Sequence, residues 1–260
     1  MTDAPDNRQR VAVVTGGSSG IGLATVRSLL AEEYRVAFFA SHEQHVVQAM
    51  AHLQKEFDED RILGCCIDIR IPAVIDGFFE LVAAQWDSPD TLVCNAGISP
   101  KGLDGATPFD ALTLDEWNDV LKVNLTGVML CCQSVLPAMK RRKFGRIMLV
   151  GSVAGRTTPR IAGPAYVASK AALAGLSRSI LSACNGTGVT VNVVAPGRIL
   201  TEMAGSPDSD DNRKALHRIP VGRLGTAQDV AHVMRFLSSA QAGFINGAII
   251  DVNGGEFAPL

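Results

Sequence analysis

A glycine-rich loop between a short apolar run and an amphipathic stretch constrains the fold of this chain more than any other feature. Residues 11–15 read Val-Ala-Val-Val-Thr, a pattern that predicts a buried strand. The loop from Gly16 to Gly22 follows at once, and residues 23–33 have the spacing of a helix. Glycines let the backbone approach a pyrophosphate, and the helix N-terminus supplies N–H donors. The spacing is Thr-Gly-x-x-x-Gly-x-Gly. In this strand–loop–helix order it predicts a phosphate-binding turn rather than a simple connection.

Strand and helix patterns alternate along the rest of the sequence. Further strands are predicted at residues 35–40, 62–67, 91–94, 146–150, 189–194 and 248–252. Helices are predicted at residues 43–57, 72–86, 114–142, 164–184 and 226–239, the third interrupted near Asn124 and Pro137. This alternation predicts an α/β chain with one domain over residues 1–260. We expect a doubly wound Rossmann fold with a mostly parallel seven-stranded sheet and helices on both faces. Residues 1–9 are expected to form a flexible tail, and residues 198–224 a lid over the site.

Composition excludes several classes of function. The net charge is −2 and both signs are spread along the chain, which argues against a nucleic-acid surface or a polybasic membrane patch. We find no apolar run of membrane-spanning length and no signal-peptide core. The six cysteines and five histidines lack metal-ligand spacing, so no metal is expected. The cysteines are interpreted as buried, reduced thiols, which predicts a cytoplasmic protein.

Tyr166 and Lys170 are the candidate catalytic pair. They lie four residues apart in a predicted helix, on one face. An ammonium beside a phenol favours the phenolate, lowers its pKa and makes it usable for acid–base chemistry. Ser152 follows the strand at 146–150, where open α/β sheets hold ligands. The alternative is a chance Tyr-x-x-x-Lys pair on the surface, and the preceding nucleotide site argues against it.

The end of the second strand bears on the choice of cofactor. An acidic residue at this position binds the ribose 2′-hydroxyl of NAD, but here the chain reads Ala40-Ser41-His42. A carboxylate would repel a 2′-phosphate, so its absence favours NADP(H), although NAD(H) stays possible because Ser19 and Ser41 are not basic. Asp68, after the third strand, could accept a hydrogen bond from adenine or act as an ordinary helix cap. Asn124 has apolar neighbours and is either a satisfied structural amide or a site residue.

Taken together, these motifs resemble those of the short-chain dehydrogenase/reductase family over essentially the full length. The motifs that agree in order and spacing are residues 15–22, Asn95-Ala96-Gly97, Asn124, Ser152, Tyr166-x-x-x-Lys170, Pro196-Gly197 and Thr201. Residues 219–225 and 252–255 are similar to the 3-oxoacyl-[acyl-carrier-protein] reductase branch.

The resemblance implies roles for individual residues. Tyr166 would be the proton donor, Lys170 would depress its pKa and contact the nicotinamide ribose, Ser152 would bind the substrate carbonyl, and Asn124 would support a water relay. The implied cofactor-binding residues are Gly16, Ser18, Ser19, Gly20, Ile21, Gly22, Ser41, His42, Asp68, Asn95, Ala96, Gly97, Tyr166, Lys170, Pro196, Gly197, Ile199 and Thr201. Family members are usually homotetramers that pair the helices at 114–142 and 164–184 and the last strand.

The sequence thus predicts an NAD(P)-dependent oxidoreductase that reduces a small or carrier-linked carbonyl compound, with a 3-oxoacyl thioester as the expected substrate. An NAD-dependent dehydrogenase of a sugar, polyol or other small alcohol is the alternative, and a non-catalytic nucleotide-binding scaffold is a third. Ser152 and Tyr166 are fourteen residues apart, where thirteen is common in this branch, so we expect a bulge at residues 157–160 beside the substrate. Lys101, Arg160 and Arg198 are expected at the rim, where cations would steer a phosphate-bearing thioester.

Overall fold

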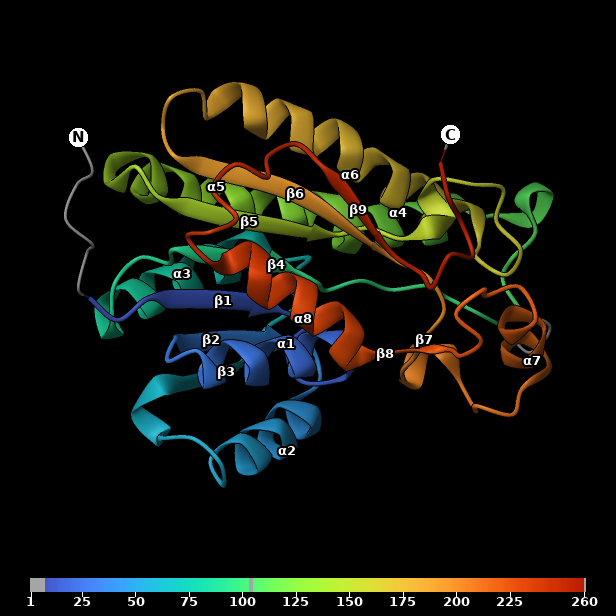
Figure 1. The fold of residues 1–260 in the computed structure, drawn as a ribbon, viewed down its shortest axis with the longest axis horizontal. Coiled ribbons are helices and arrows are strands. Elements are labelled where there is room, and N and C mark those ends of the chain that lie inside the picture. Colours follow the sequence, from blue (N-terminus) through green and yellow to red (C-terminus); the bar gives the residue numbers. More distant parts are fainter. Residues whose placement is uncertain (1–7, 103–104, 260) are drawn as a thin grey trace.

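A seven-stranded parallel sheet forms the centre of the computed structural model, which describes residues 8–102 and 105–259 (Figure 1). The strand order is β3-β2-β1-β4-β5-β6-β9, and every neighbouring pair is parallel. The strands are β1 (Val11–Thr15), β2 (Arg35–Ala40), β3 (Ile62–Cys66), β4 (Thr91–Cys94), β5 (Gly145–Val150), β6 (Val189–Pro196) and β9 (Ile249–Val252). The predicted fold class is confirmed, and the order reverses between β1 and β4, where such sheets bind ligands.

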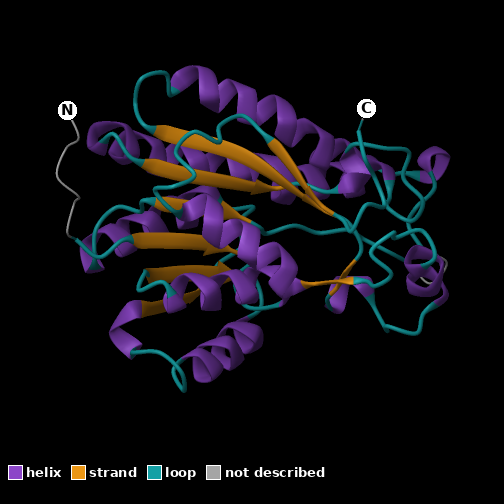
Figure 2. Ribbon diagram, viewed as in Figure 1, coloured by secondary structure: helices purple, strands orange, loops and turns teal. Residues whose placement is uncertain are grey.

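Helices cover both faces of the sheet, as Figure 2 shows. One face packs against α1 (Gly20–Ala31), α2 (Glu43–Leu53) and α8 (Ala227–Ser238). The other packs against α3 (Pro72–Gln85), α5 (Gly127–Arg142) and α6 (Pro164–Ala183), with α4 (Leu114–Leu121) leading into α5. The 3₁₀ turns are Glu59–Arg61, Phe109–Ala111, Val153–Gly155 and Glu202–Ala204. The central strands β1, β4, β5 and β6 are therefore buried along their whole length, as a doubly covered parallel sheet requires, whereas the edge strands β3 and β9 are only partly buried.

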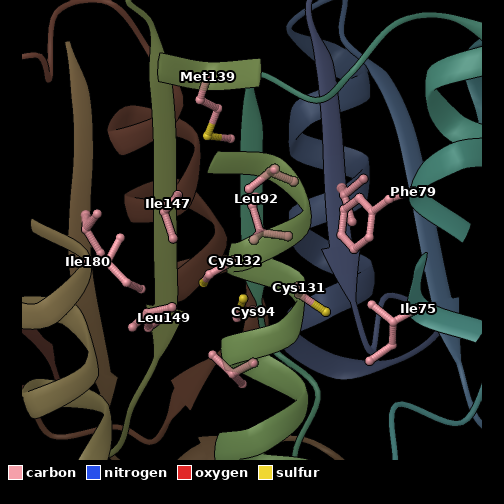
Figure 3. Close-up of a cluster of buried hydrophobic side chains, with 14 of the residues drawn as sticks. Ile75, Phe79, Leu92, Cys94, Cys131, Cys132, Met139, Ile147, Leu149 and Ile180 are labelled. Carbon is pink, nitrogen blue, oxygen red and sulfur yellow. The ribbon is translucent and has the colours of Figure 1, made fainter. Parts of the chain in front are cut away.

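Cysteines fill part of the core between α5 and the sheet. Figure 3 shows Cys94 of β4 beside Cys131 and Cys132 of α5, among Leu92 and Ile147. All three are buried free thiols that act as small apolar side chains. The interpretation of every cysteine as buried was wrong for β3. Cys66 is exposed and Cys65 is half-buried, because the strand carrying them is at the sheet edge.

The long helical region is interrupted once, not twice as predicted. Residues Lys122–Thr126 form a turn of π-helix between α4 and α5, which confirms the break near Asn124. Pro137 lies inside α5, which continues past it without interruption. Pro137 lacks an N–H for the carbonyl of Gln133, but both residues are exposed, so water can take that place.

The predicted flexible tail extends too far. Arg8 forms ion pairs with Asp87 and Asp90, and the Gln9 side chain donates to the Glu33 carbonyl at 2.9 Å. Both residues are therefore attached to the folded chain, and residues 1–7 lie outside the described part.

One helical run, Leu114–Arg142, has the length and apolar character of a membrane span. On this criterion, the prediction that no run reaches that length was wrong. However, 44% of its most apolar window is buried inside the fold, and core helices of soluble proteins pass the same test. Its inward side chains pack on the sheet, so the run gives only weak evidence for a membrane span.

Two short strands and a helix lie beyond the carboxyl ends of the large sheet (Figure 1). They are β7 (Ile199–Leu200), which pairs in parallel with β8 (Gly225–Thr226), and α7 (Asp210–Leu216). Residues 198–224, which were predicted as a lid, thus contain β7 and the short helix α7. Thr226 caps α8 in a reciprocal capping box with Asp229, at the start of the helix predicted for residues 226–239.

Candidate active site

A cavity of about 670 Å³ opens along the carboxyl ends of the strands. It brings together nearly all of the predicted site residues. Those lining it are Gly16, Ser18, Ser19, Gly20, Ile21, Ser41, His42, Asp68, Asn95, Ala96, Gly97, Ser152, Tyr166, Lys170, Pro196, Gly197, Ile199 and Thr201. Gly22 and Asn124 lie behind its wall. Residues far apart in sequence therefore meet at one end of the sheet, where the sequence predicted a site.

The glycine loop fits a dinucleotide phosphate group. Gly16 and Gly20 have φ angles of +64° and +51°, which favour glycine. A Cβ on Gly16 would lie 2.9 Å from the Ala96 Cα, and one on Gly22 would lie 2.0 Å from the Gly16 carbonyl oxygen. The loop therefore stays free of side chains beside the start of α1, whose N–H groups favour an anion.

Asn95 ties this loop to β4. Its Nδ2 donates to the carbonyl oxygens of Thr15 at 3.2 Å and Gly16 at 2.9 Å. The Thr15 hydroxyl accepts from the backbone N–H groups of Asn95 and Ala96, at 3.0 and 2.9 Å. Asn95 therefore acts on the cofactor site at least by holding the glycine loop in place.

Ser152, Tyr166 and Lys170 line the cavity together as a polar group. Ser152 caps the turn after β5 and accepts from the Ala154 N–H at 3.1 Å. Tyr166 and Lys170 are one turn apart on α6, and the Lys170 Nζ lies 5.6 Å from the centroid of the Tyr166 ring. The Lys170 ammonium donates to the Val150 carbonyl at 2.7 Å, so it is anchored to β5.

The electrostatics of this group differ from the sequence expectation in one respect. Burial raises the pKa of the Tyr166 phenol, while a hydrogen bond with Ser152 opposes the rise. Burial also lowers the pKa of Lys170 to about 8. The predicted lowering of the Tyr166 pKa by Lys170 is thus wrong for the protein alone, because the ammonium is directed to a backbone carbonyl and burial dominates.

Asn124 has every polar atom of its side chain satisfied. Its Oδ1 accepts from the Ile98 N–H at 2.8 Å, and its Nδ2 donates to the Ile98 carbonyl at 2.9 Å and to the Ser169 hydroxyl at 3.0 Å. The side chain is fully buried in the π-turn. Asn124 therefore joins α4–α5, α6 and the loop after β4, as the structural alternative predicted.

The opposite end of the cavity carries an ionic network that the sequence did not reveal. Arg70 donates through Nε and a terminal nitrogen to both oxygens of Asp68, and also to Asp119 of α4 at 2.8 Å. These bonds lower the pKa of Asp68. The Asp68 side chain is therefore paired with Arg70 and is not a helix cap. Arg70 was missed because it lies beyond a strand end without a recognised motif.

Residues 157–162 and the C-terminal residues Glu256 and Phe257 also line the cavity. Phe257 lines the cavity, and the Arg156 guanidinium lies 5.1 Å from its ring centroid. Arg156 also forms an ion pair with Asp251 of β9. The sequence did not indicate Phe257 or the pairing of Arg156 with Asp251, because these contacts join residues about a hundred positions apart.

The three predicted rim cations do not share one environment. Lys101 and Arg160 line the cavity and are exposed. Arg198 also lines it, but its Nε donates to the Asn212 Oδ1 at 2.6 Å and a terminal nitrogen donates to the Ala204 carbonyl at 3.0 Å. Arg198 therefore lies at the cavity as expected, and it also joins α7 to the segment around β7 through these two uncharged partners.

Comparisons with known proteins agree with this geometry. The family model described as short chain dehydrogenase matches residues 10–212. The 3-oxoacyl-[acyl-carrier-protein] reductase of Salmonella typhimurium is 36% identical over 249 residues, covering 95% of this chain and 97% of the relative. The acetoacetyl-CoA reductase of Shinella zoogloeoides is 36% identical over 251 residues, covering 95% and 98%. A crystal structure of 3-oxoacyl-[acyl-carrier protein] reductase from Brucella melitensis superimposes with a TM-score of 0.90 at 29% identity, covering 98% of this chain and 94% of the other.

Proposed function

The chain belongs to the short-chain dehydrogenase family and is an oxidoreductase that acts on CH–OH groups with a nicotinamide cofactor, and from this premise we propose that it reduces 3-oxoacyl thioesters. The observation that carries the proposal is that Ser152 and Tyr166 line the same cavity as the glycine loop. The names of the Salmonella and Shinella relatives support a thioester-linked 3-oxoacyl substrate.

In the proposed mechanism, the protein orients and polarises the carbonyl group. The cavity residues Tyr166, Lys170 and the glycine loop would hold a nicotinamide cofactor, which when bound would supply the hydride that the carbonyl carbon accepts. The Ser152 hydroxyl donates a hydrogen bond to the carbonyl oxygen, and the Tyr166 phenol delivers a proton to the same oxygen. Lys170, fixed on the Val150 carbonyl, places a cation near the phenolate that this transfer leaves behind. Asn124 positions α6 through Ser169, so its contribution to the reaction is indirect.

We propose NADP(H) as the preferred cofactor. No carboxylate follows β2 to repel a 2′-phosphate, and Ser41 and His42 line the cavity at that point. Asp68, the nearest carboxylate after β3, is paired with Arg70 and so carries less unbalanced negative charge.

We further propose a single catalytic domain whose residues 198–224 act as a lid. The proposed assembly is a cytoplasmic homotetramer. Leu114 at the start of α4 and Phe244 before β9 are exposed apolar side chains, and they support pairing through these elements. Light scattering of the purified protein would test the assembly, with a mass near that of one chain contradicting it.

The experiment that tests the reaction measures nicotinamide consumption with a panel of carbonyl compounds. The panel contains a 3-oxoacyl thioester, a small uncharged ketone and an oxidised polyol, and each is assayed with NADPH and NADH. We expect the highest kcat/KM with the thioester and NADPH. A clear preference for the oxidised polyol with NADH would favour the alternative function, an NAD-dependent dehydrogenase of a sugar or polyol. Turnover of none of them would favour a non-catalytic scaffold.

A further inference from the structure

Arg198, which lies between β6 and β7, is a half-buried cation that lines the cavity. We propose that Arg198 binds a carboxylate on the acyl part of the substrate, so that the preferred thioester carries a 3-oxo chain with an anionic far end. The inference rests on the proposed reduction of 3-oxoacyl thioesters and names the class of acyl chain, which no motif in the sequence indicates.

The guanidinium of Arg198 is held in place by a buried amide. Its Nε donates to the Asn212 Oδ1 at 2.6 Å, and one terminal nitrogen donates to the Ala204 carbonyl at 3.0 Å. Asn212 is fully buried, and its own Nδ2 donates to the carbonyl oxygens of Ser206 at 2.6 Å and Ala204 at 3.3 Å. Arg198 is therefore oriented before any ligand binds, which reduces the entropy that a ligand must overcome.

Part of the hydrogen-bonding capacity of Arg198 is unused. A guanidinium carries N–H donors on each of its nitrogens. The second terminal nitrogen of Arg198, Nη1, forms no hydrogen bond within the described chain and is not closed off from solvent. Neighbouring N–H groups on the two terminal nitrogens are therefore available to hold both oxygens of one carboxylate.

The positive charge of Arg198 also lacks a counter-ion in contact. Among the described residues no carboxylate forms an ion pair with it, and the Glu256 carboxylate is held by Arg218 at 2.9 Å. Burial lowers the pKa of Arg198, and the more distant carboxylates of Asp211 and Glu256 only oppose this effect. The wall of the cavity therefore presents a cation that a ligand anion can neutralise.

This wall is unfavourable for a plain alkyl chain. An apolar chain packed against Arg198 would displace water from the unused N–H groups without replacing the hydrogen bonds, which costs free energy. A carboxylate would replace that water with a bidentate, charge-assisted pair. The side chain therefore favours an acyl chain that ends in a carboxylate over one that ends in a methyl group.

The phosphates of a carrier arm fit other cations better. Lys101 and Arg160 line the cavity as exposed side chains, whereas Arg198 is half-buried and bonded to a buried residue. A carrier protein is too large to enter a cavity of about 670 Å³, so it keeps its phosphate near the exposed surface. Arg198 is therefore placed for the part of the substrate that enters the cavity.

The test compares acyl chains of equal length on a thioester that has no phosphate. The substrates are the N-acetylcysteamine thioesters of 3-oxohexanoate and of 3-oxohexanedioate, in which a carboxylate replaces the terminal methyl group. A third substrate carries a carboxamide at that end. Steady-state reduction with NADPH gives kcat/KM for each. We expect the value for the carboxylate chain to exceed both uncharged chains by roughly tenfold or more, as for a hydrogen bond between charged groups.

Three variants assign this preference to Arg198. Arg198→Gln should lower the ratio of kcat/KM for the carboxylate chain to that for the methyl chain by roughly tenfold to a hundredfold. Arg198→Lys should retain part of the ratio, because the charge stays and the fork is lost. Any loosening of α7 acts on both substrates, so the ratio isolates the contact with the carboxylate. Arg213→Gln is the matched control, since it removes an exposed cation from α7 outside the cavity lining.

Two results would overturn the inference. One is an unmodified protein that reduces the methyl chain as well as the carboxylate chain. The other is a ratio that is unchanged in Arg198→Gln, and a simultaneous loss of NADPH affinity in a fluorescence titration would then assign the guanidinium to the cofactor. Both differ from a failure of the proposed function, in which none of the thioesters would be reduced.

Discussion

At the scale of single residues, Lys170 is the most constrained polar group of the site. It is an ammonium with a side chain only 7% exposed, hydrogen-bonded to a strand carbonyl and close to the Cys94 thiol. Burial lowers its pKa to about 8, which means that the folded protein holds the charged form at a cost. The proposed mechanism uses this cation, so the buried charge lowers the stability of the fold while it serves the reaction.

This cost predicts a specific dependence of stability on pH. A lysine whose pKa is lower in the folded than in the unfolded state destabilises the fold while it is charged, and the cost disappears as the pH rises from about 8 to above 10. We compare the free energy of unfolding of the unmodified protein with that of Lys170→Met, by urea denaturation between pH 7.5 and 10. Between pH 7.5 and 10, the free energy of unfolding of the unmodified protein should increase by about 2 kcal/mol relative to that of Lys170→Met. A constant difference would contradict the account.

At the scale of elements, the sequence correctly predicted the strands and helix ends that depend on interactions between neighbouring residues. The runs that became β1, β2 and β4 and the capping box at Thr226 depend on neighbouring residues, so the sequence contained the information. The π-turn around Asn124 was visible only as a break, because its cause is contact with Ile98 and Ser169 from elsewhere in the chain.

Long-range contacts explain where the sequence failed. Pro137 was expected to interrupt a helix that tertiary packing keeps intact. Arg198 was expected only as a cation at the rim, and the sequence did not indicate its hydrogen bonds to Asn212 and Ala204 of the following segment. Arg70 and Phe257 line the cavity because the fold brings their segments to the ends of the strands. Neither residue belongs to a recognised motif, so the sequence did not indicate them.

The contact between Arg156 and β9 predicts a role for the C-terminal segment. Arg156→Leu removes the guanidinium that joins the turn after β5 to Asp251 and Phe257. Leaving the Asp251 carboxylate without this partner should lower the free energy of unfolding by about 1–3 kcal/mol. It should also raise the KM for the 3-oxoacyl substrate, because the wall of the cavity loosens.

Arg213→Leu is the control for this change, since it removes an arginine from the exposed ion pair with Asp210. We expect less than about 0.5 kcal/mol of change there. Urea denaturation and steady-state kinetics measure both variants, and equal effects of the two substitutions would refute the assignment.

At the scale of the whole molecule, the candidate catalytic residues lie at the carboxyl ends of the strands, and exposed charged side chains surround the cavity there. Lys101 and Arg160 line the cavity as exposed cations that can steer a phosphate-bearing thioester, and unlike Arg198 they can be replaced without releasing Asn212 of α7. Lys101→Ala combined with Arg160→Ala should raise the KM for the thioester several-fold at low ionic strength and reduce its salt dependence. A small uncharged ketone should respond little.

Lys140→Ala combined with Arg141→Ala removes the same charge from the far end of α5 and serves as the control. If the ketone and the thioester respond alike to the rim variant, or if the control has the same effect, steering by the rim is excluded.

The most direct test of the account is the turnover of Tyr166→Phe, which removes only the hydroxyl that the mechanism uses as the proton donor. Titration with NADPH first establishes that the variant still binds its cofactor, and steady-state reduction of a 3-oxoacyl thioester is then measured. The account predicts retained NADPH binding and a kcat lower by roughly 10²–10⁴-fold, the usual contribution of a general acid. Turnover close to that of the unmodified protein, on any good substrate, would contradict it.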